Sequence, residues 1–313
     1  MSAQAKNVFR LSASGRSIHR FGNAKQSGGH MKAVYLLGLI GTGIQASLTP
    51  AMHMQEAEAL GFRHVYRLID LTELRLGVEA LPDLLTAAER MGFNGLNITH
   101  PCKQLVLPLL HELSDDARAI GAVNTVVFKD GKRIGHNTDA SGFAAAFRRG
   151  LADAKLDRVV QFGAGGAGCA VANAVLGLGA RRLTLVDTDA ARAGDLAASL
   201  CARFGPGRAE VCGDLADAVA SADGLINATP LGMAKYPGQA VPDAMLRPNH
   251  WVSDIVYFPL ETALLAGARA KGCRVLSGGG MAVFQAVDAF QLFTGQTPSA
   301  DRMLAHFAQL TAA

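Results

Sequence analysis

Short apolar runs alternate with longer segments of helical periodicity along most of the chain. In the first half, apolar runs bounded by glycine, proline or polar residues predict strands at 34–39, 64–71, 94–99, 121–128 and 133–136. The segments between them predict helices at 51–60, 79–91 and 101–113. The turn Lys129-Asp130-Gly131 predicts a hairpin between the last two strands. This order of elements predicts a parallel sheet with an antiparallel edge pair.

The same alternation resumes in the second half, after a linking helix predicted at 141–149. Further strands are predicted at 158–162, 182–186, 209–212, 224–227 and 251–256. Further helices are predicted at 166–178, 189–204, 214–221, 261–271, 281–293 and 299–310. The two runs of strands and helices indicate an α/β protein.

Composition narrows the class of protein. Of the 313 residues, 50% are hydrophobic and 18% are charged, which suits a globular protein of about two domains. No apolar run approaches the roughly 18 residues that a membrane-spanning helix needs. The five cysteines include no Cys-x-x-Cys pair, so we expect neither a disulfide framework nor a metal site, and a reducing, cytoplasmic compartment.

The positive charge of the chain is concentrated at its beginning. Residues 1–30 contain five basic residues and no acidic one, and removing those five charges from the net charge of +4 leaves −1 for the rest. A nearly neutral body gives no indication of nucleic-acid binding. We expect residues 1–30 to be a disordered extension ahead of a natural start near Met31, with an organelle transit peptide as the alternative.

A glycine-rich loop follows the strand predicted at 158–162. Its sequence fits Gly-x-Gly-x-x-Gly, and the next residues open an apolar helix. In this context the glycines allow a tight turn and close approach of a pyrophosphate to the free N–H groups of the helix. The alternative is a plain strand–helix turn. The glycines of the loop are Gly163, Gly165, Gly166 and Gly168.

The next predicted strand ends at Asp187, 19 residues beyond Gly168. An acid at this place accepts hydrogen bonds from the ribose hydroxyls of NAD and repels the 2′-phosphate of NADP. Arg192 lies one turn into the following helix, where we expect it to face solvent or to pair with a neighbouring acid. The sequence therefore favours NAD as cofactor.

Polar residues also follow several predicted strands of the first half. These segments are Ser47-Leu48-Thr49, Asn97 to Lys103, Asn124-Thr125 and Asn137-Thr138-Asp139. Ligands bind at the carboxyl ends of parallel strands, and an alcohol dehydrogenase needs a group that takes the hydroxyl proton. Each residue also has a structural explanation, as a helix cap, a turn residue or a surface lysine. Spacing alone therefore indicates a nicotinamide dehydrogenase of unknown substrate.

Several short motifs nevertheless occur together in one order. They are Ser47-Leu48-Thr49-Pro50, Asn97-Ile98-Thr99-His100-Pro101-Cys102-Lys103, Gly121-Ala122-Val123-Asn124-Thr125, Gly135-His136-Asn137-Thr138-Asp139, the glycine loop, Asn227-Ala228-Thr229-Pro230-Leu231-Gly232-Met233, Asp254-Ile255-Val256-Tyr257, and Gly280-Met281 with Gln285. With them the chain resembles the shikimate dehydrogenase family from about Met31 to its end, and most closely the quinate/shikimate dehydrogenase branch.

The resemblance implies a two-domain fold and a set of roles. A Rossmann-like nucleotide domain is expected at 140–275, and a substrate-binding domain at 31–139 and 276–313, completed by the C-terminal helices. Lys103 and Asp139 are implied as the catalytic pair at the oxidised hydroxyl. The implied substrate residues are Ser47, Thr49 and Tyr257 at the carboxylate, Asn124 and Gln285 at the hydroxyls, and Thr99 in the pocket wall. The implied cofactor neighbours are Met281 and the 227–233 loop with Asn227 and Thr229.

Two positions depart from the common biosynthetic pattern of the family. That pattern has Ser-x-Ser where this chain has Ser47-Leu48-Thr49, and NADP-using members have Asn-Arg-Thr where it has Asp187-Thr188-Asp189. Both departures match the NAD-using quinate branch. We therefore expect oxidation of a ring hydroxyl of quinate or shikimate to 3-dehydroquinate or 3-dehydroshikimate, with NAD. A biosynthetic NADP enzyme and a non-catalytic sensor of quinate are the alternatives, and the assembly state, a homodimer included, is left open.

Overall fold

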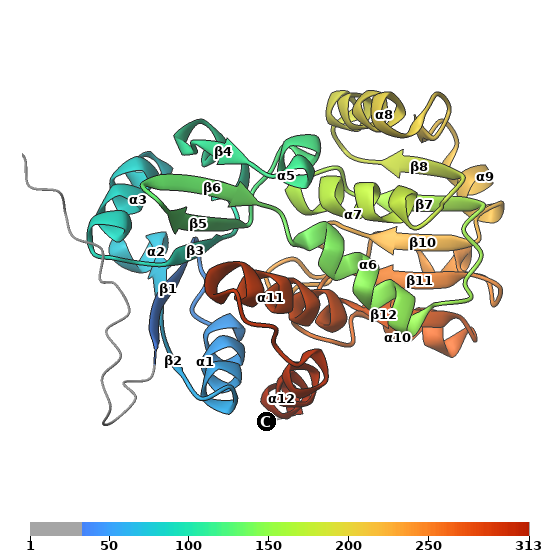
Figure 1. Ribbon diagram of the computed structural model, residues 1–313. Helices are drawn as coiled ribbons and strands as arrows, with labels where there is room; N and C mark the ends of the chain where they lie inside the picture. The colour runs from blue at the N-terminus through green and yellow to red at the C-terminus, as the bar shows by residue number, and fades with distance from the viewer. Residues whose placement is uncertain (1–32, 313) are drawn as a thin grey trace, which may run out of the picture. The chain divides into compact units, whose positions relative to one another are not determined.

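Two six-stranded sheets organise residues 33–312, the part of the chain that the computed structural model describes (Figure 1). The extension expected at 1–30 lies outside the described residues. Each sheet is accompanied by helices, so the chain has the α/β architecture that its sequence predicts.

The first sheet is mixed. Its strands are β1 (Val34–Gly41), β2 (Arg63–Asp70), β3 (Gly95–Ile98), β4 (Glu112–Leu113), β5 (Thr125–Lys129) and β6 (Lys132–His136). They lie in the order β2-β1-β3-β5-β6-β4, with β1 parallel to β2 and β3, and with β5 antiparallel to both β3 and β6. The predicted β5–β6 hairpin is present, and its turn residues Asp130 and Gly131 have φ values of 51° and 73°. The hairpin is not at the sheet edge as predicted, because β4 pairs with the outer side of β6.

The helices of the first half are α1 (Thr49–Ala59), α2 (Leu71–Leu74), α3 (Leu81–Arg90), α4 (Cys102–Leu105) and α5 (Asp115–Ile120). Helix α1 is close to its prediction, but the later helices of the first half are shorter and more broken than predicted. The helix predicted at 101–113 is wrong: α4 gives way to a 3₁₀ turn at Leu107–Leu109 that contains Pro108, and then to β4. Proline cannot continue the α-helical hydrogen bonds, which explains the break. The predicted strand at 121–128 begins only at Thr125, because its first residues follow the end of α5.

The second sheet is parallel throughout. Its strands are β7 (Arg158–Phe162), β8 (Arg182–Val186), β9 (Ala209–Val211), β10 (Gly224–Asn227), β11 (Trp251–Asp254) and β12 (Arg274–Ser277). Its helices are α7 (Gly166–Gly177), α8 (Ala190–Phe204), α9 (Leu215–Ala220) and α10 (Ala263–Ala270). The order β9-β8-β7-β10-β11-β12 is that of a doubly wound, Rossmann-like sheet, whose strand order reverses between β7 and β10. The sequence analysis missed β12, a strand of four residues.

Helices α6 (Asp139–Gly150) and α11 (Gly278–Thr294) run side by side between the two sheets (Figure 1). Their close approach requires a glycine, because a Cβ atom at Gly142 would lie 2.7 Å from the backbone nitrogen of Gln285. The last helix, α12 (Ala300–Ala312), packs on α11 and α1. The division into two domains at 139/140 and 275/276 stays a prediction. Helices α6 and α11 begin near these two predicted boundaries.

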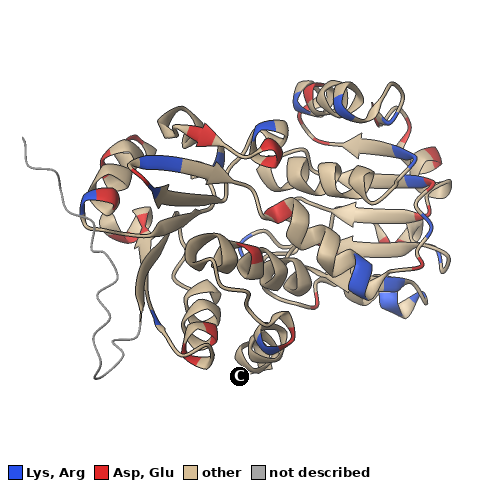
Figure 2. Cartoon of the chain, in the orientation of Figure 1, with Lys and Arg blue, Asp and Glu red and all other residues tan. Residues whose placement is uncertain are grey.

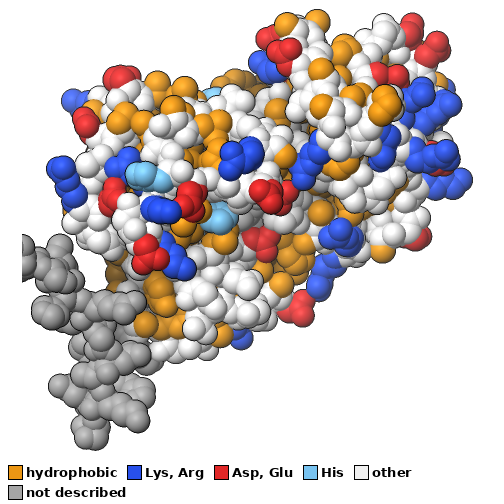
Figure 3. All heavy atoms as spheres, turned by 45° about the horizontal axis from the view of Figure 1, so that its top comes forward, with side chains coloured by type: hydrophobic (Ala, Val, Ile, Leu, Met, Phe, Trp, Pro, Cys, Tyr) orange, Lys and Arg blue, Asp and Glu red, His pale blue; other side chains and the backbone are white. Residues whose placement is uncertain are grey.

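Charged residues of both signs are intermixed along the cartoon of Figure 2. Figure 3 shows charged side chains interspersed with apolar and neutral ones on one face. Within residues 33–312, no helix has the length and apolar character that a membrane crossing requires.

Candidate active site

An ion pair joins the start of α4 to the start of α6. The Nζ atom of Lys103 lies 2.6 Å from Oδ2 of Asp139, and their side chains are 20% and 5% exposed. Asp139 is the first residue of α6, and its backbone N–H donates to the Oδ1 atom of Asn137. Two segments 36 residues apart thus place one cation and one carboxylate at the same point, as the sequence analysis expected.

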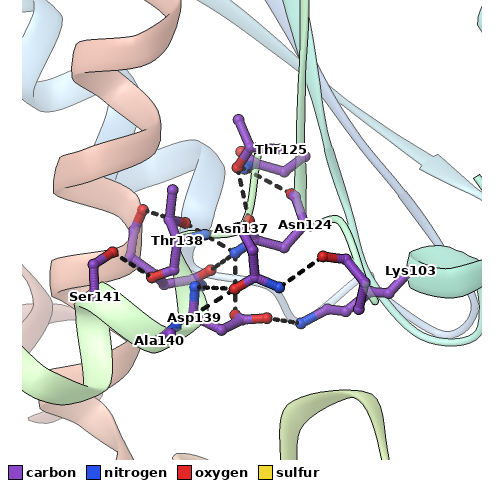
Figure 4. A network of polar contacts seen from close by, with 11 residues as sticks. Lys103, Asn124, Thr125, Asn137, Thr138, Asp139, Ala140 and Ser141 are labelled. Atoms are coloured by element: carbon purple, nitrogen blue, oxygen red, sulfur yellow. Dashed lines mark hydrogen bonds and ion pairs between the residues drawn. The ribbon is translucent and has the colours of Figure 1, made fainter. Parts of the chain in front are cut away.

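Asn124 is the centre of the polar network around this pair (Figure 4). Its side-chain amide donates to Oδ1 of Asp139 and to Oε1 of Gln285, at 3.1 Å in each case. Its own Oδ1 atom accepts the backbone N–H of Thr138 at 2.8 Å. Both carboxylate oxygens of Asp139 are therefore occupied, one by Lys103 and the other by Asn124. Four of the predicted residues, Lys103, Asn124, Asp139 and Gln285, come together here.

A second layer of polar residues fixes Asn124, and sequence reasoning gave it no role. Thr125 donates to Oδ1 of Asn124, Asn97 donates to Thr125, and Tyr66 donates to Asn97 at 2.6 Å. Asn97 is 6% exposed and lies in β3, and burial raises the pKa of the Tyr66 hydroxyl. Polar side chains in an otherwise apolar buried strand were the available signal, since such groups need internal partners.

The residues predicted for the substrate carboxylate lie at two places. Ser47 Oγ donates to Thr49 Oγ1 at 3.2 Å where α1 begins. Tyr257 follows β11 in the second sheet and is 39% exposed. Thr99 follows β3, and its methyl group fills the space that a side chain at Gly41 would need. Among the hydrogen bonds of residues 33–312, none joins these residues to Lys103 or Asp139, so their place in one site stays a prediction.

The glycine loop has the shape that a bound dinucleotide needs. A Cβ at Gly163 would lie 2.6 Å from the carbonyl oxygen of Ala228, and one at Gly168 would collide with the carbonyl of Gly163. Above Gly165 and Gly166, by contrast, a Cβ would meet no atom within 4 Å. The loop is thus packed on one side and open on the other, beside the N-terminus of α7, where the sheet order reverses.

Asp187 sits just beyond the end of β8, beside the glycine loop. Its side chain is 5% exposed, and its carboxylate accepts the backbone N–H of Ala164 at 2.7 Å and the guanidinium of Arg192 at 2.5 Å. Burial alone would raise the pKa of this carboxyl, but hydrogen bonds from Arg192, Asp189 and Ala164 lower the pKa to about 2. Arg192 therefore pairs with a neighbouring acid, one of the two placements expected for it.

The loop after β10 is held by Asn227. Its side-chain amide donates to the carbonyl of Leu231 and to Asp254, both at 2.9 Å, and its Oδ1 accepts the N–H of Thr229. Burial raises the pKa of Asp254, a group that is 0% exposed. Met281 is 8% exposed and packs in the apolar core with Phe143. The roles of Asn227, Thr229 and Met281 beside a cofactor stay predictions.

Comparisons with known proteins identify the family of the chain. Residues 39–126 match the family described as the shikimate dehydrogenase substrate binding domain. The chain is 57% identical to a shikimate dehydrogenase (NADP(+)) of Streptomyces avermitilis, over 88% of this chain and 96% of that enzyme.

The chain belongs to the shikimate dehydrogenase family.

Two further relatives of the family are named for a different cofactor. A quinate/shikimate dehydrogenase (NAD(+)) of Corynebacterium efficiens is 52% identical over 88% of this chain and 98% of that enzyme. The structure of quinate dehydrogenase from Corynebacterium glutamicum in complex with NAD superposes with a TM-score of 0.84 at 50% identity, covering 88% of this chain and 99% of that one. The chain is therefore an oxidoreductase of the shikimate/quinate dehydrogenase family that uses a pyridine nucleotide. Some of its relatives are named for NADP and others for NAD.

Proposed function

We propose that this chain is an NAD-dependent quinate/shikimate dehydrogenase, which oxidises a ring hydroxyl to 3-dehydroquinate or 3-dehydroshikimate. The observation that carries the proposal is the 2.6 Å pair of Lys103 and Asp139, set in a network with two amide side chains. Oxidation of an alcohol removes a proton from oxygen and a hydride from carbon. A proton acceptor and donors that orient the ring are therefore what the protein must supply.

Lys103 takes the hydroxyl proton in this scheme. Acting as the general base, its Nζ atom accepts the proton, so that the positive charge of the resulting ammonium lies beside the carboxylate of Asp139. The charge formed on Lys103 is thus stabilised by a group that Asn124 already holds in place. A bound nicotinamide supplies the acceptor for the hydride. Asp139 has the further role of orienting the Lys103 amine toward the oxygen.

Asn124 and Gln285 orient the ring through its other hydroxyls. Asn124 directly precedes β5 and Gln285 lies in α11, and their amides are 3.1 Å apart. Each amide has both a donor and an acceptor. Ser47, Thr49 and Tyr257 provide hydroxyl groups for the substrate carboxylate. Thr49 carries one more methyl group than the serine usual in the family, and this methyl shapes the wall beside the carbon at which quinate and shikimate differ.

Asp187 supports NAD as the preferred cofactor. Its carboxylate lies beside the glycine loop and is ionised, so in the proposed complex it accepts ribose hydroxyls and repels a 2′-phosphate. Arg192 could neutralise a 2′-phosphate, but in the structure it is engaged by Asp187. The relatives at 57% identity that are named for NADP make the NADP enzyme the second candidate, with Arg192 turned toward the phosphate.

A two-by-two kinetic panel tests the proposal. Quinate and shikimate are each assayed with NAD and with NADP, and kcat/KM is compared across the four pairs. We expect turnover of at least one acid, with NAD used about a hundredfold better than NADP, the scale that an unfavourable charge pair can impose. Comparable use of both nucleotides, or a preference for NADP, would favour the second candidate. No turnover of either acid would refute the dehydrogenase function.

A further inference from the structure

A buried carboxylate at the end of β2 has no part in the chemistry described so far. Asp70 is 2% exposed, and its hydrogen-bond donors are neutral and come mainly from a distant loop. Its two oxygens accept the backbone N–H groups of Gly43 and Ile44, both at 2.8 Å. The side-chain amide of Gln45 adds a third bond at 3.1 Å, and the N–H of Thr72 a fourth at 3.0 Å.

The loop is shaped to present these donors. Gly43 has a φ of +65°, a conformation that glycine adopts without strain, and this turns two successive N–H groups toward one anion. Burial alone would raise the pKa of Asp70, but the bonds from Gln45, Gly43, Ile44 and Thr72 outweigh it and keep the pKa below its usual value. The carboxylate is thus ionised in the folded protein at neutral pH.

A continuous line of hydrogen bonds leads from Asp70 to the predicted carboxylate-binding hydroxyls. Ile44, whose N–H is held by Asp70, accepts the N–H of Ser47 with its own carbonyl at 2.9 Å. The Ser47 hydroxyl in turn donates to Thr49 at 3.2 Å. The position of both hydroxyls therefore depends on the turn that Asp70 fixes.

The same turn faces the second half of the molecule. A Cβ atom at Gly43 would lie 3.1 Å from Nζ of Lys235. Lys235 belongs to the Met233–Tyr236 turn, which follows β10 and the Asn227 loop. The turn at 43–45 therefore lies where the substrate-binding residues of the first half meet the cofactor side of the second.

We propose that Asp70 is a positioning residue of the active site: it holds the 43–45 turn so that the hydroxyls of Ser47 and Thr49 are aimed at the carboxylate of the substrate. The proposal rests on the proposed function, because it assumes a carboxylate substrate. It predicts that loss of the Asp70 charge weakens recognition of the carboxylate and leaves the chemical step and the nucleotide site nearly intact.

Asp70→Asn is the informative change, because an amide has the same shape but only one acceptor oxygen for the two N–H groups. We expect KM for shikimate to rise about tenfold, with kcat within about threefold and KM for the nucleotide unchanged, since the lost interaction concerns binding. The methyl ester of shikimate, which lacks the charge, should be affected much less. The ratio of kcat/KM for the acid to that for the ester should therefore fall.

Glu56→Gln is the matched control. Glu56 is a second buried carboxylate of the same half, bound by Arg302 and by the N–H of Ser299. Within residues 33–312, its side chain forms no hydrogen bond with the 43–45 turn. We expect this variant to lower the melting temperature without changing the acid-to-ester ratio. Should Asp70→Asn fail to fold, Gly43→Ala disturbs the same turn from the loop side and must lower the same ratio.

Two results would overturn the proposal. One is an unchanged KM for shikimate in Asp70→Asn. The other is an equal loss of kcat/KM for the acid and for the ester, together with a fall in melting temperature like that expected for Glu56→Gln. Asp70 would then be a structural residue only. Failure of the proposed function is a separate outcome, because the unsubstituted enzyme would then turn over neither quinate nor shikimate.

Discussion

At the residue scale, the structure concentrates its polar side chains around one carboxylate. Asp139 is almost fully buried, yet both of its oxygens have partners. Lys103 is more exposed than Asp139, so one side of the pair is open to an incoming hydroxyl while the other is fixed. This asymmetry supports the proposed roles of the pair, proton transfer by the lysine and orientation by the aspartate.

Replacing Lys103 with alanine should therefore reduce turnover. Loss of a general base lowers kcat by about a hundredfold to ten-thousandfold, whereas substrate binding keeps its other donors. Steady-state kinetics and a separate measurement of substrate affinity distinguish the two effects. Lys129→Ala, at an exposed position of the β5–β6 hairpin, is the control. Intact turnover with weakened binding would make Lys103 a binding residue and direct attention to Asp139 as base.

Replacing Asp187 with alanine should narrow the preference for NAD. The change removes the repulsion of a 2′-phosphate and also releases Arg192. We expect kcat/KM with NADP to rise by about tenfold or more, since a removed charge repulsion is worth on the order of 1–2 kcal/mol. Asp214→Ala, which removes the cap of α9, should leave the cofactor ratio unchanged. An unaltered ratio in Asp187→Ala would mean that other residues choose the nucleotide.

At the element scale, the parallel second sheet was easier to predict than the mixed first one. Strands β7, β8 and β10 are short apolar runs between clear turn signals, and their bounds agree with the sequence prediction. The segment 101–113 was misjudged because its apolar residues fit helical spacing, while Pro108 and the pairing with β6 decided otherwise. The local pattern of apolar and polar residues does not show which distant strand a segment will pair with.

The candidate site was predictable in a different way. Lys103, Asn124, Asp139 and Gln285 came from ordered motifs rather than from periodicity, and the structure brings these four together. Asp70 was not identified, because a polar residue at a strand end has many uses. Three of its four partners lie 25 to 27 residues away, and only the folded chain shows that they converge.

The packing of α6 against α11 gives a prediction at this scale. A Cβ at Gly142 would lie 2.7 Å from backbone of α11, so Gly142→Ala must separate the helices that carry Asp139 and Gln285. Overpacking of this kind costs about 1–3 kcal/mol. Displacing the catalytic groups by a fraction of an ångström should lower kcat about tenfold or more.

Gly194→Ala provides the contrasting control. Gly194 lies within α8, and a Cβ there would meet nothing within 4 Å. This change should stabilise the protein by about 0.5–1 kcal/mol, because alanine favours the helix more than glycine does. Urea denaturation and kcat measured on both variants check the pair. Unchanged stability and kcat in Gly142→Ala would show that the helix contact tolerates a methyl group.

At the scale of the whole molecule, a buried pair of histidines links stability to pH. His53 and His64 are 0% and 7% exposed, with ring centroids 5.8 Å apart, and their ring nitrogens have no hydrogen-bond partner among the described residues. Burial lowers the pKa of His53 to about 3, helped by His64, and lowers the pKa of His64 to about 4. Both rings are therefore uncharged in the folded protein at neutral pH.

Stability should consequently fall on acidification. In the unfolded chain both histidines take up protons below about pH 6.5, whereas the folded chain resists protonation until about pH 4 to 3. Each group should then contribute a loss of up to about 1.4 kcal/mol per pH unit below 6.5. Urea unfolding at pH 7.5 and pH 5.5 measures this, and His53→Phe should reduce the slope while His111→Ala, at an exposed position, should not. If the free energy of unfolding changed equally with pH in the unsubstituted protein and in both variants, His53 would not be a source of the pH dependence.

The path of the chain between its two halves has an evolutionary consequence. The whole second sheet is one uninterrupted stretch, entered after α6 and left before α11, and the two crossings adjoin, since a Cβ at Gly150 would lie 2.8 Å from the side chain of Leu276. A segment whose two ends lie close together can be replaced as a unit without rearranging the rest of the fold. Under the proposed role of Asp187 in cofactor choice, recombination at these two points would transfer that choice and leave the Lys103–Asp139 pair in place. Lineages that share one reaction could in this way acquire different nucleotide preferences.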